Sequence, residues 1–442
     1  MLDSEPSYSY LLQKSWPIIL ANSAVPLLGL TDTFIIGNFG KVEEIGAIAL
    51  GATIFAILYW SFGFLRMSTT GFVAQAFGKN DHNEIRATFA RSLLVAFTIG
   101  ISIIILQTLI NFLIGVGLSA SEEVKKVTSD YFLIRVWGAP ATLGMFVVTG
   151  VLIGLGKSRL LLTIQLFLNG LNIFLDIVFV VGFKWGVEGI AVGTVISEWS
   201  ALIFAFILLL PLMSKQRKPN EEFWPTLLIF NRKKIKRTIG ANFDIFIRTL
   251  LLVLSFYWFN NESSKFSDEI LAANFILLQL ITFSAFFLDG YAFVAESLIG
   301  KAVGLKNKAL FITTIRKTSF LALGTAIALA SIIYMFGNNF IELLTDIDIV
   351  RDFARSSLIF AALYILLSCG AFQLDGIFIG ATASKSMRNA SIASFAILMT
   401  TWMILRADFN NQLLWITFII YLLARAITLL YYFPRLLTQF KR

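Results

Sequence analysis

The sequence contains little charge, one cysteine and one histidine, and each scarcity excludes a class of protein. Asp, Glu, Lys and Arg make up 14% of the 442 residues, whereas a soluble protein carries about a quarter of its residues as these four types. Cys369 alone forms no intramolecular disulfide and no cysteine metal site. His82 lies in the polar stretch KNDHNEIR, so neither a His-based triad nor a cluster of His metal ligands can be assembled. The segment GLGK at 154–157 is too short for a Walker A motif, so ATP hydrolysis is not supported either.

Long apolar runs take the place of the missing charge. The chain is 57% hydrophobic, and its mean hydropathy is +0.80. About 20 mainly apolar residues cross the hydrocarbon core of a bilayer, and such segments satisfy their own backbone groups as helices. We therefore expect an all-α membrane protein with twelve transmembrane helices. They are predicted at residues 13–38, 46–77, 88–116, 126–153, 158–182, 188–213, 238–260, 267–300, 309–336, 350–380, 386–405 and 411–436.

The net charge of +9 lies mostly in short segments between the apolar runs, which favours contact with lipid headgroups over nucleic acid. One set of alternate connections holds 20 Lys and Arg residues and the other set holds 8. The richer side is cytoplasmic by the positive-inside rule, which predicts that both termini are cytoplasmic. The start of the chain, MLDSEPSYSY, is acidic where a signal peptide would be basic. We expect a multi-pass protein of a bacterial inner membrane that acts as a monomer.

A polar, basic connection divides the chain near its middle. We expect an N-terminal six-helix bundle at 1–213, a cytoplasmic linker at 214–237 and a C-terminal six-helix bundle at 238–442. The halves look related, because GVLIG (150–154) recurs as GIFIG (376–380), and FVAQ (72–75) recurs as FVAE (293–296). The repeats predict two pseudo-symmetric bundles around a central cavity near the membrane midplane.

Asp32 lies inside the first apolar run, where an ionisable group costs at least ~2.5–3.5 kcal/mol at a helix centre. Pro26 and Gly29 precede it, and proline opens the turn before it. A carboxylate beside such a turn suits a proton-driven bend of the helix. The alternative is a static ion pair or hydrogen bond to a neighbouring helix.

A polar stripe follows one face of the apolar run 158–182. Its members fall at i, i+4, i+7 and i+11, so they share a helix face, and on the next run Thr194 and Glu198 again share one. The stripe consists of Gln165, Asn169, Asn172 and Asp176. Amides around a carboxylate relay a proton or hold water, which favours a cavity. The alternative is a hydrogen-bonded helix–helix interface.

The second half carries its own charges within apolar runs. Asp289 and Asp375 each precede a glycine, and Arg248 is the nearest counter-charge, with Asp244 one turn before it. Arg66 falls near the repeat position of Asp289 in the first half. A second-lobe polar network of Arg248, Asp289, Asp375 and Arg66 is as consistent with these residues as an ion site is, because unpaired buried charge is costly.

Several segments resemble the multidrug and toxic compound extrusion (MATE) family, in its DNA-damage-inducible F branch. The segments are GLTDTFIIG (29–37), FGFLRMSTTGFVAQAFG (62–78), LNIFLDIVFVVG (171–182), ANFDIFIRTL (241–250), LDGYAFVAESLIGKAVG (288–304) and QLDGIFIGA (373–381). The resemblance implies two bundles about a V-shaped cavity and cation-driven export. It also implies an N-terminal-lobe proton and substrate cluster formed by Asp32, Tyr131, Asn172, Asp176 and Thr194.

The sequence therefore predicts a proton-coupled antiporter without a cofactor or bound metal, which exports small organic compounds, often cationic or amphipathic, by alternating access. Asp375 resembles an aspartate that sodium-coupled relatives use, but Arg248 stands near the place of their second acid, so sodium coupling is the less favoured form. A flippase for lipid-linked or amphipathic molecules is the other alternative, with the same pair of bundles. A channel or a membrane enzyme lacks a filter motif or a catalytic cluster here.

Overall fold

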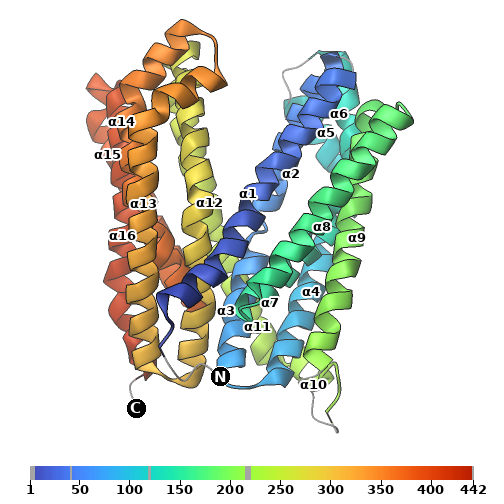
Figure 1. Cartoon of the computed structure of the whole chain (residues 1–442), viewed down its shortest axis with the longest axis vertical. Coiled ribbons are helices and arrows are strands. Elements are labelled where there is room, and N and C mark those ends of the chain that lie inside the picture. The colour runs from blue at the N-terminus through green and yellow to red at the C-terminus, as the bar shows by residue number, and fades with distance from the viewer. Residues whose placement is uncertain (1–4, 40–41, 118–120, 215–220, 441–442) are drawn as a thin grey trace. The chain divides into compact units, whose positions relative to one another are not determined.

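The computed structural model describes residues 5–39, 42–117, 121–214 and 221–440, and over these residues the regular structure is helical throughout (Figure 1). The helices are α1 (Tyr8–Phe39), α2 (Val42–Trp60), α3 (Phe64–Gly78), α4 (His82–Ile105), α5 (Gln107–Gly117), α6 (Glu122–Arg135), α7 (Ala139–Gly154), α8 (Ser158–Asp176), α9 (Gly186–Ser214), α10 (Thr226–Ile229), α11 (Arg232–Ser264), α12 (Asp268–Leu305), α13 (Lys308–Leu344), α14 (Asp348–Gly380), α15 (Ser384–Leu405) and α16 (Asn411–Leu437).

Eleven helical segments of the described chain are long and apolar enough to cross a membrane. α1, with 32 residues, supplies the remaining predicted helix. The predicted second run, 46–77, is interrupted in the structure, since α2 ends at Trp60 and α3 begins at Phe64. α6 and α7 are likewise joined by a 3₁₀ turn at Val136–Gly138 and together form one span, Glu122–Gly154. The predicted all-α membrane fold is thereby confirmed.

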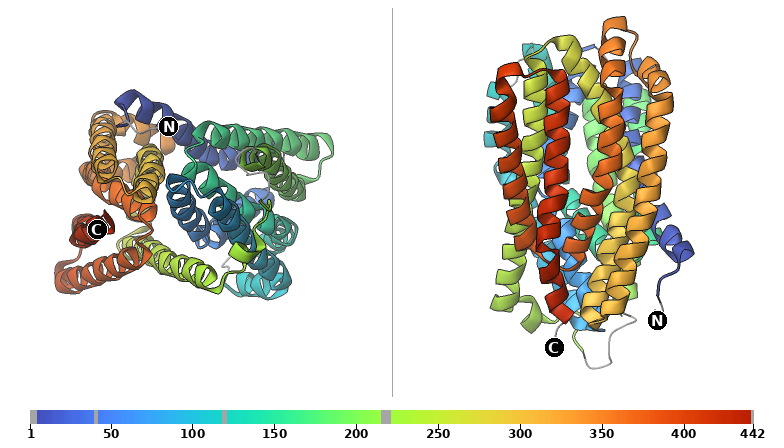
Figure 2. Two further views of the ribbon diagram at one scale, coloured as in Figure 1. Left: turned by 90° about the horizontal axis from the view of Figure 1, so that it is seen from below. Right: turned by 90° about the vertical axis from the view of Figure 1, so that its left-hand side faces the viewer.

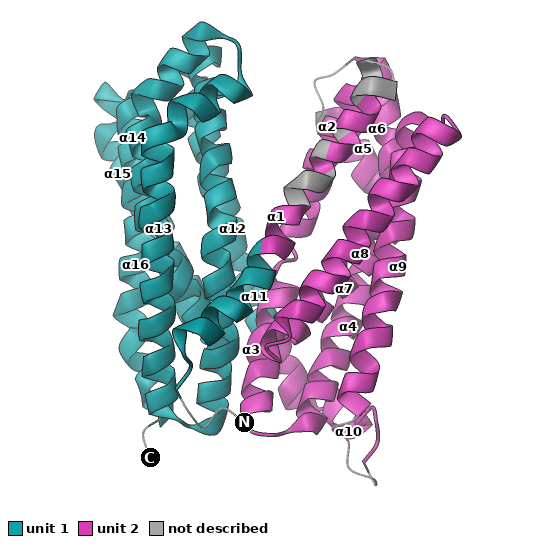
Figure 3. Cartoon of the chain, in the orientation of Figure 1, with its two compact units in different colours: residues 1–19, 240–442 teal, residues 20–239 magenta. Residues whose placement is uncertain are grey.

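The chain forms two compact units (Figure 3). Unit 1 consists of Met1–Ile19 and Gly240–Arg442, and unit 2 consists of Leu20–Ile239. Two helices are divided between the units, because α1 runs through the first boundary and α11 through the second. The first helix of each half therefore begins in the unit that is built mainly by the other half.

Corresponding helices pack together in both units. In unit 2, α3 packs on α4 and α7, and α9 packs on α7 and α8. In unit 1, α12 packs on α13 and α14, and α16 packs on α14 and α15. Figure 2 shows the long helices α13 to α16 running side by side. The core of unit 1 is rich in aromatic rings, including Phe259, Trp415 and Phe418, which are all fully buried.

The turns of the two units repeat at a constant offset of 226 residues (306 − 80). Asn80 and Lys306 adopt left-handed backbone conformations with φ of 57° and 56°. The residue after each one, Asp81 or Asn307, caps the next helix by accepting a hydrogen bond from the backbone N–H three residues on, at 2.9 Å in both cases. This agreement of turn and cap extends the internal duplication from sequence to backbone geometry.

The repeated glycine motifs lie at one and the same helix crossing. A Cβ atom on Gly150 would lie 2.6 Å from the carbonyl oxygen of Arg66, and one on Gly376 would collide with that of Ala292. Only glycine lets α7 and α14 approach α3 and α12 this closely, as in other membrane helix pairs. The crossing also corrects one expectation, because Arg66 corresponds to Ala292 and not to Asp289. The FVAQ and FVAE segments, 221 residues apart, are five residues out of this register.

Candidate functional site

Two carboxyl groups face each other in unit 2. Asp32 lies on α1, and Asp176 is the last residue of α8 and is completely buried. They lie within hydrogen-bonding reach of one another. No hydroxyl, amide or guanidinium of the described residues donates to either oxygen of Asp176. A hydrogen bond between two carboxyls requires a proton on one of them, so this pair is arranged to share one. Pro26, which the sequence analysis placed before this site, has a side chain outside the described residues.

The predicted polar stripe lies beside the acid pair and joins α8 to its neighbours. Asn172 Nδ2 donates to Thr194 Oγ1 on α9 at 3.2 Å, and Asn169 Nδ2 donates to the Ala24 carbonyl on α1 at 3.2 Å. Gln165 donates to Asn169 at 3.2 Å. The stripe is therefore partly a helix–helix interface. The Oδ1 atom of Asn172 is buried and accepts no hydrogen bond from a described residue, so it remains available to water or a cation.

Arg135, at the end of α6, is the cation of this site. Its guanidinium lies 3.7 Å from Glu198 and 4.5 Å from the centre of the Phe55 ring. It also lies 5.9 Å from the ring of Tyr131, which is itself buried. Electrostatic contacts link Arg135 to both Asp32 and Asp176. The sequence analysis did not assign Arg135 to the site, although its spacing of four residues from Tyr131 placed both on one helix face.

Irregular backbone turns adjoin two of these charged residues. The 3₁₀ turn Val136–Gly138 follows Arg135, and a π-helical turn, Ile177–Gly182, follows Asp176. π turns recur at functional sites because they displace a helix's hydrogen bonds. Glycines make room for the acids, since a Cβ atom on Gly193 would lie 2.7 Å from Asp176 Oδ1. A Cβ atom on Gly138 would collide with the Glu198 carboxylate.

Unit 1 contains a separate network centred on Asp375. Arg425 lies 2.9 Å from Asp375 Oδ2, and Arg248 forms a second ion pair with the same oxygen. All three side chains are at most 14% exposed. Two guanidinium groups on one carboxylate leave little negative charge for a further cation. Arg425 was not assigned from sequence, because nothing in the spacing of α14 and α16 indicates their contact.

The structure changes the expected pairing of the other charges. Asp244 bonds to Arg388 at 2.7 Å and accepts a hydrogen bond from Ser384 at 2.9 Å, both on α15. Asp244 and Arg248 are thus each tied to a neighbouring helix, whereas the sequence suggested that they pair along α11. Asp289 is half-buried on α12 in unit 1, and Arg66 is half-buried on α3 in unit 2.

The described residues contain no group of three or more His, Cys, Asp or Glu side chains close enough to hold a metal ion. The positions that correspond to the stripe in unit 1 are apolar, since Leu398 and Trp402 follow Asn172 and Asp176 by 226 residues. The acid pair and its amides are therefore a feature of one unit of the duplicated fold.

Comparison with known proteins places this architecture in a family. The MatE family profile matches residues 17–178 and 245–402. The DNA damage-inducible protein F of Escherichia coli is 33% identical over 93% of this chain and 89% of its own length. The multidrug export protein MepA of Staphylococcus aureus is 21% identical over 92% of this chain and 89% of its own. A MOP superfamily transporter from Pyrococcus furiosus shares the fold, with a TM-score of 0.88 and 18% identity over 99% of this chain and 98% of the other. The chain therefore belongs to the MATE family of multidrug efflux transporters and is a secondary transporter, not an enzyme.

Proposed function

We propose that this transporter exports small organic compounds, often cationic or amphipathic, in exchange for protons. The observation that carries the proposal is the facing pair of Asp32 and Asp176. Two unit charges ~4 Å apart interact by about 4 kcal/mol at an effective dielectric constant of 20. That repulsion favours one proton on the pair over two ionised carboxylates. Loading and releasing this proton changes the charge between α1 and α8.

In the proposed cycle, protonation of the pair relaxes α1, and release of the proton prepares the site for a new substrate. Tyr131, Asn172 and Thr194 line the same region and supply polar contacts. One proton moving inward across 100 mV gains ~2.3 kcal/mol, which sustains a concentration ratio of about fiftyfold. We place the protein in a bacterial inner membrane with both termini in the cytoplasm, on the strength of its Lys and Arg distribution.

Sodium coupling through Asp375 is less favoured for a structural reason. A sodium ion bound to this carboxylate would compete with Arg248 and Arg425, which both pair with its Oδ2 atom. Displacing a buried partner leaves an uncompensated charge and is costly. A flippase remains the alternative among substrates, and lipid scrambling with headgroup-labelled lipids tests it.

The test compares Asp32→Asn, Asp176→Asn and Asp375→Asn in proteoliposomes at matched protein levels. Asparagine keeps the shape of the side chain but holds it neutral, as in the protonated state. We expect Asp32→Asn to insert normally and to lose pH-driven uptake, and Asp176→Asn to show a similar or smaller loss. Asp375→Asn should retain pH-driven flux. Wild-type pH-driven flux in Asp32→Asn, or sodium-driven flux that only Asp375→Asn abolishes, would refute the proposal.

A further inference from the structure

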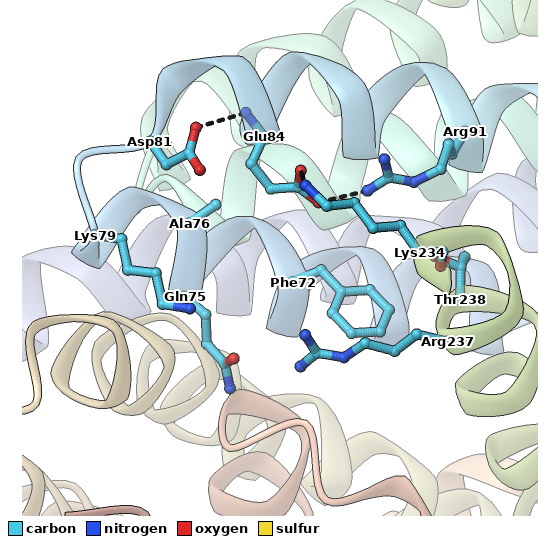
Figure 4. Close-up of a pocket in the computed structure, with 10 residues that line it drawn as sticks. All are labelled: Phe72, Gln75, Ala76, Lys79, Asp81, Glu84, Arg91, Lys234, Arg237 and Thr238. Atoms are coloured by element: carbon cyan, nitrogen blue, oxygen red, sulfur yellow. Dashed lines mark hydrogen bonds and ion pairs between the residues drawn. The ribbon is translucent and has the colours of Figure 1, made fainter. Parts of the chain in front are cut away.

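A hollow of about 160 Å³ lies within unit 2, between the end of α3, the start of α4 and the first turns of α11 (Figure 4). Lys79 follows the last residue of α3, and Asp81 caps α4. Lys234 and Arg237 come from the first turns of α11. The hollow thus lies at the ends of apolar spans, where a membrane protein meets the headgroups of the bilayer.

Cations outnumber acids in the lining. The hollow is lined by the cations Lys79, Arg91, Lys234 and Arg237 and by the two acids Asp81 and Glu84. Figure 4 shows the Glu84 carboxylate between Arg91 and Lys234, and it forms ion pairs with both. Asp81 is engaged in capping α4. Both acids are therefore occupied by protein partners, and the lining as a whole retains an excess of positive charge.

Arg91 provides a second indication of a ligand. Its side chain is about 95% buried, since its exposure is 5%. One terminal nitrogen donates to the Leu228 carbonyl at 2.7 Å, and the other donates to Glu84 at 2.6 Å. The Nε atom is buried and has no hydrogen-bond partner among the described residues. Buried donors of folded proteins are almost always satisfied, so an acceptor is expected here.

The cations are also held in place. The Arg237 guanidinium lies 5.0 Å from the centre of the Phe72 ring. Glu84 fixes Lys234 to α4, and Arg91 fixes the segment around Leu228. Preorganised cations bind an anion at a smaller entropic cost than flexible ones do.

Exposed apolar residues adjoin this region. Leu227 on α10 is 89% exposed and Phe230 is 65% exposed, and a basic run, Arg232–Arg237, follows them. Apolar side chains next to a basic cluster are typical of a segment that lies in the membrane interface. The phosphate groups of lipids lie at this depth.

We propose that this hollow binds a negatively charged phosphate group, as carried by an anionic phospholipid headgroup or a soluble phosphate ester. The phosphate oxygens accept from Arg91 Nε and lie against Lys79, Lys234 and Arg237. A bound phosphate joins the start of α11 to α3 and α4 and so stabilises this part of unit 2.

The test uses the full chain, delipidated and placed in nanodiscs of phosphatidylglycerol mixed with phosphatidylcholine, with bound lipid counted by native mass spectrometry. A second arm titrates detergent-solubilised protein with glycerol 1-phosphate and with inorganic phosphate and follows the unfolding temperature. Lys79→Gln and Arg237→Gln remove cations from the lining. Lys236→Gln removes an exposed cation of the same basic run that does not line the hollow.

We expect the wild type to retain phosphatidylglycerol selectively, and each lining variant to weaken retention about fivefold. Lys236→Gln should bind as the wild type does. Protection by the soluble phosphates with the same pattern of variants would support the site and identify a free phosphate as its source. Equal losses in Lys236→Gln and the lining variants, or no selective retention in the wild type, would overturn the proposal.

Discussion

At the scale of single residues, the charge balance around Arg135 decides what the site of unit 2 does. One guanidinium stands against the carboxyls of Asp32, Asp176 and Glu198. Glu198 lies within ion-pair distance of Arg135, at 3.7 Å, and both side chains are at most 15% exposed. This pairing uses the available positive charge and leaves the two aspartates to share a proton. Arg135 is thus a positioning residue for the acid pair.

Removing the cation alone should therefore destabilise the protein. Arg135→Gln leaves the buried carboxylate of Glu198 uncompensated, and breaking a buried pair costs roughly 3–5 kcal/mol. The double variant Arg135→Gln/Glu198→Gln removes both charges and should recover most of this loss, as measured by thermal unfolding in detergent. A double variant that is as unstable as Arg135→Gln would show that the pair contributes no coupling of this kind.

The residues of the stripe were predictable because helical periodicity places Gln165, Asn169, Asn172 and Asp176 on one face. Their partners were not predictable in the same way. Arg388, which bonds to Asp244, is 144 residues away in sequence, and only the packing of α11 on α15 brings them together. The sequence analysis paired Asp244 with Arg248 because proximity along one helix was the only geometry available to it.

At the scale of helices, the crossings of α7 with α3 and of α14 with α12 depend on glycine. Gly376→Ala should destabilise unit 1, because its Cβ atom would meet the backbone carbonyl of Ala292, which has no free space to move. Overpacking of this kind costs about 1–3 kcal/mol. Gly370→Ala is the matched control on the same helix, since its Cβ atom would lie 3.8 Å from Ala426. The measurement is the yield of monodisperse protein and its unfolding temperature, and equal values for the two variants would contradict the argument.

Hydropathy predicted the helices well because lipid imposes a single solvent along each span. It could not predict where a span is interrupted. The breaks before Phe64 and after Arg135, and the π turn after Asp176, depend on local hydrogen bonds that leave the apolar character unchanged. The repeat was visible in the glycine motifs, but its register was not, since FVAQ and FVAE match in sequence without being equivalent in space.

At the scale of the whole molecule, the proposed orientation is tested at the two ends of α13. A cysteine at Asp346, whose side chain is fully exposed, should react with an impermeant thiol reagent in intact cells. A cysteine at Lys308, at the other end of the helix, should react only after the membrane is made permeable. The native Cys369 is buried and gives little background. Labelling of Lys308→Cys from outside would reverse the orientation that the Lys and Arg counts indicate.

The duplicated fold carries its acid pair in one unit only, because Leu398 and Trp402 occupy the corresponding positions of the other. A single shared proton per cycle has an electrical consequence. Exchange of that proton for a monovalent cation moves no net charge, so only the pH difference drives it and the membrane potential does no work. Exchange for a neutral compound carries one charge inward, generates a current and gains ~2.3 kcal/mol per 100 mV. The charge of the cargo, and not the protein, then decides whether voltage takes part in export.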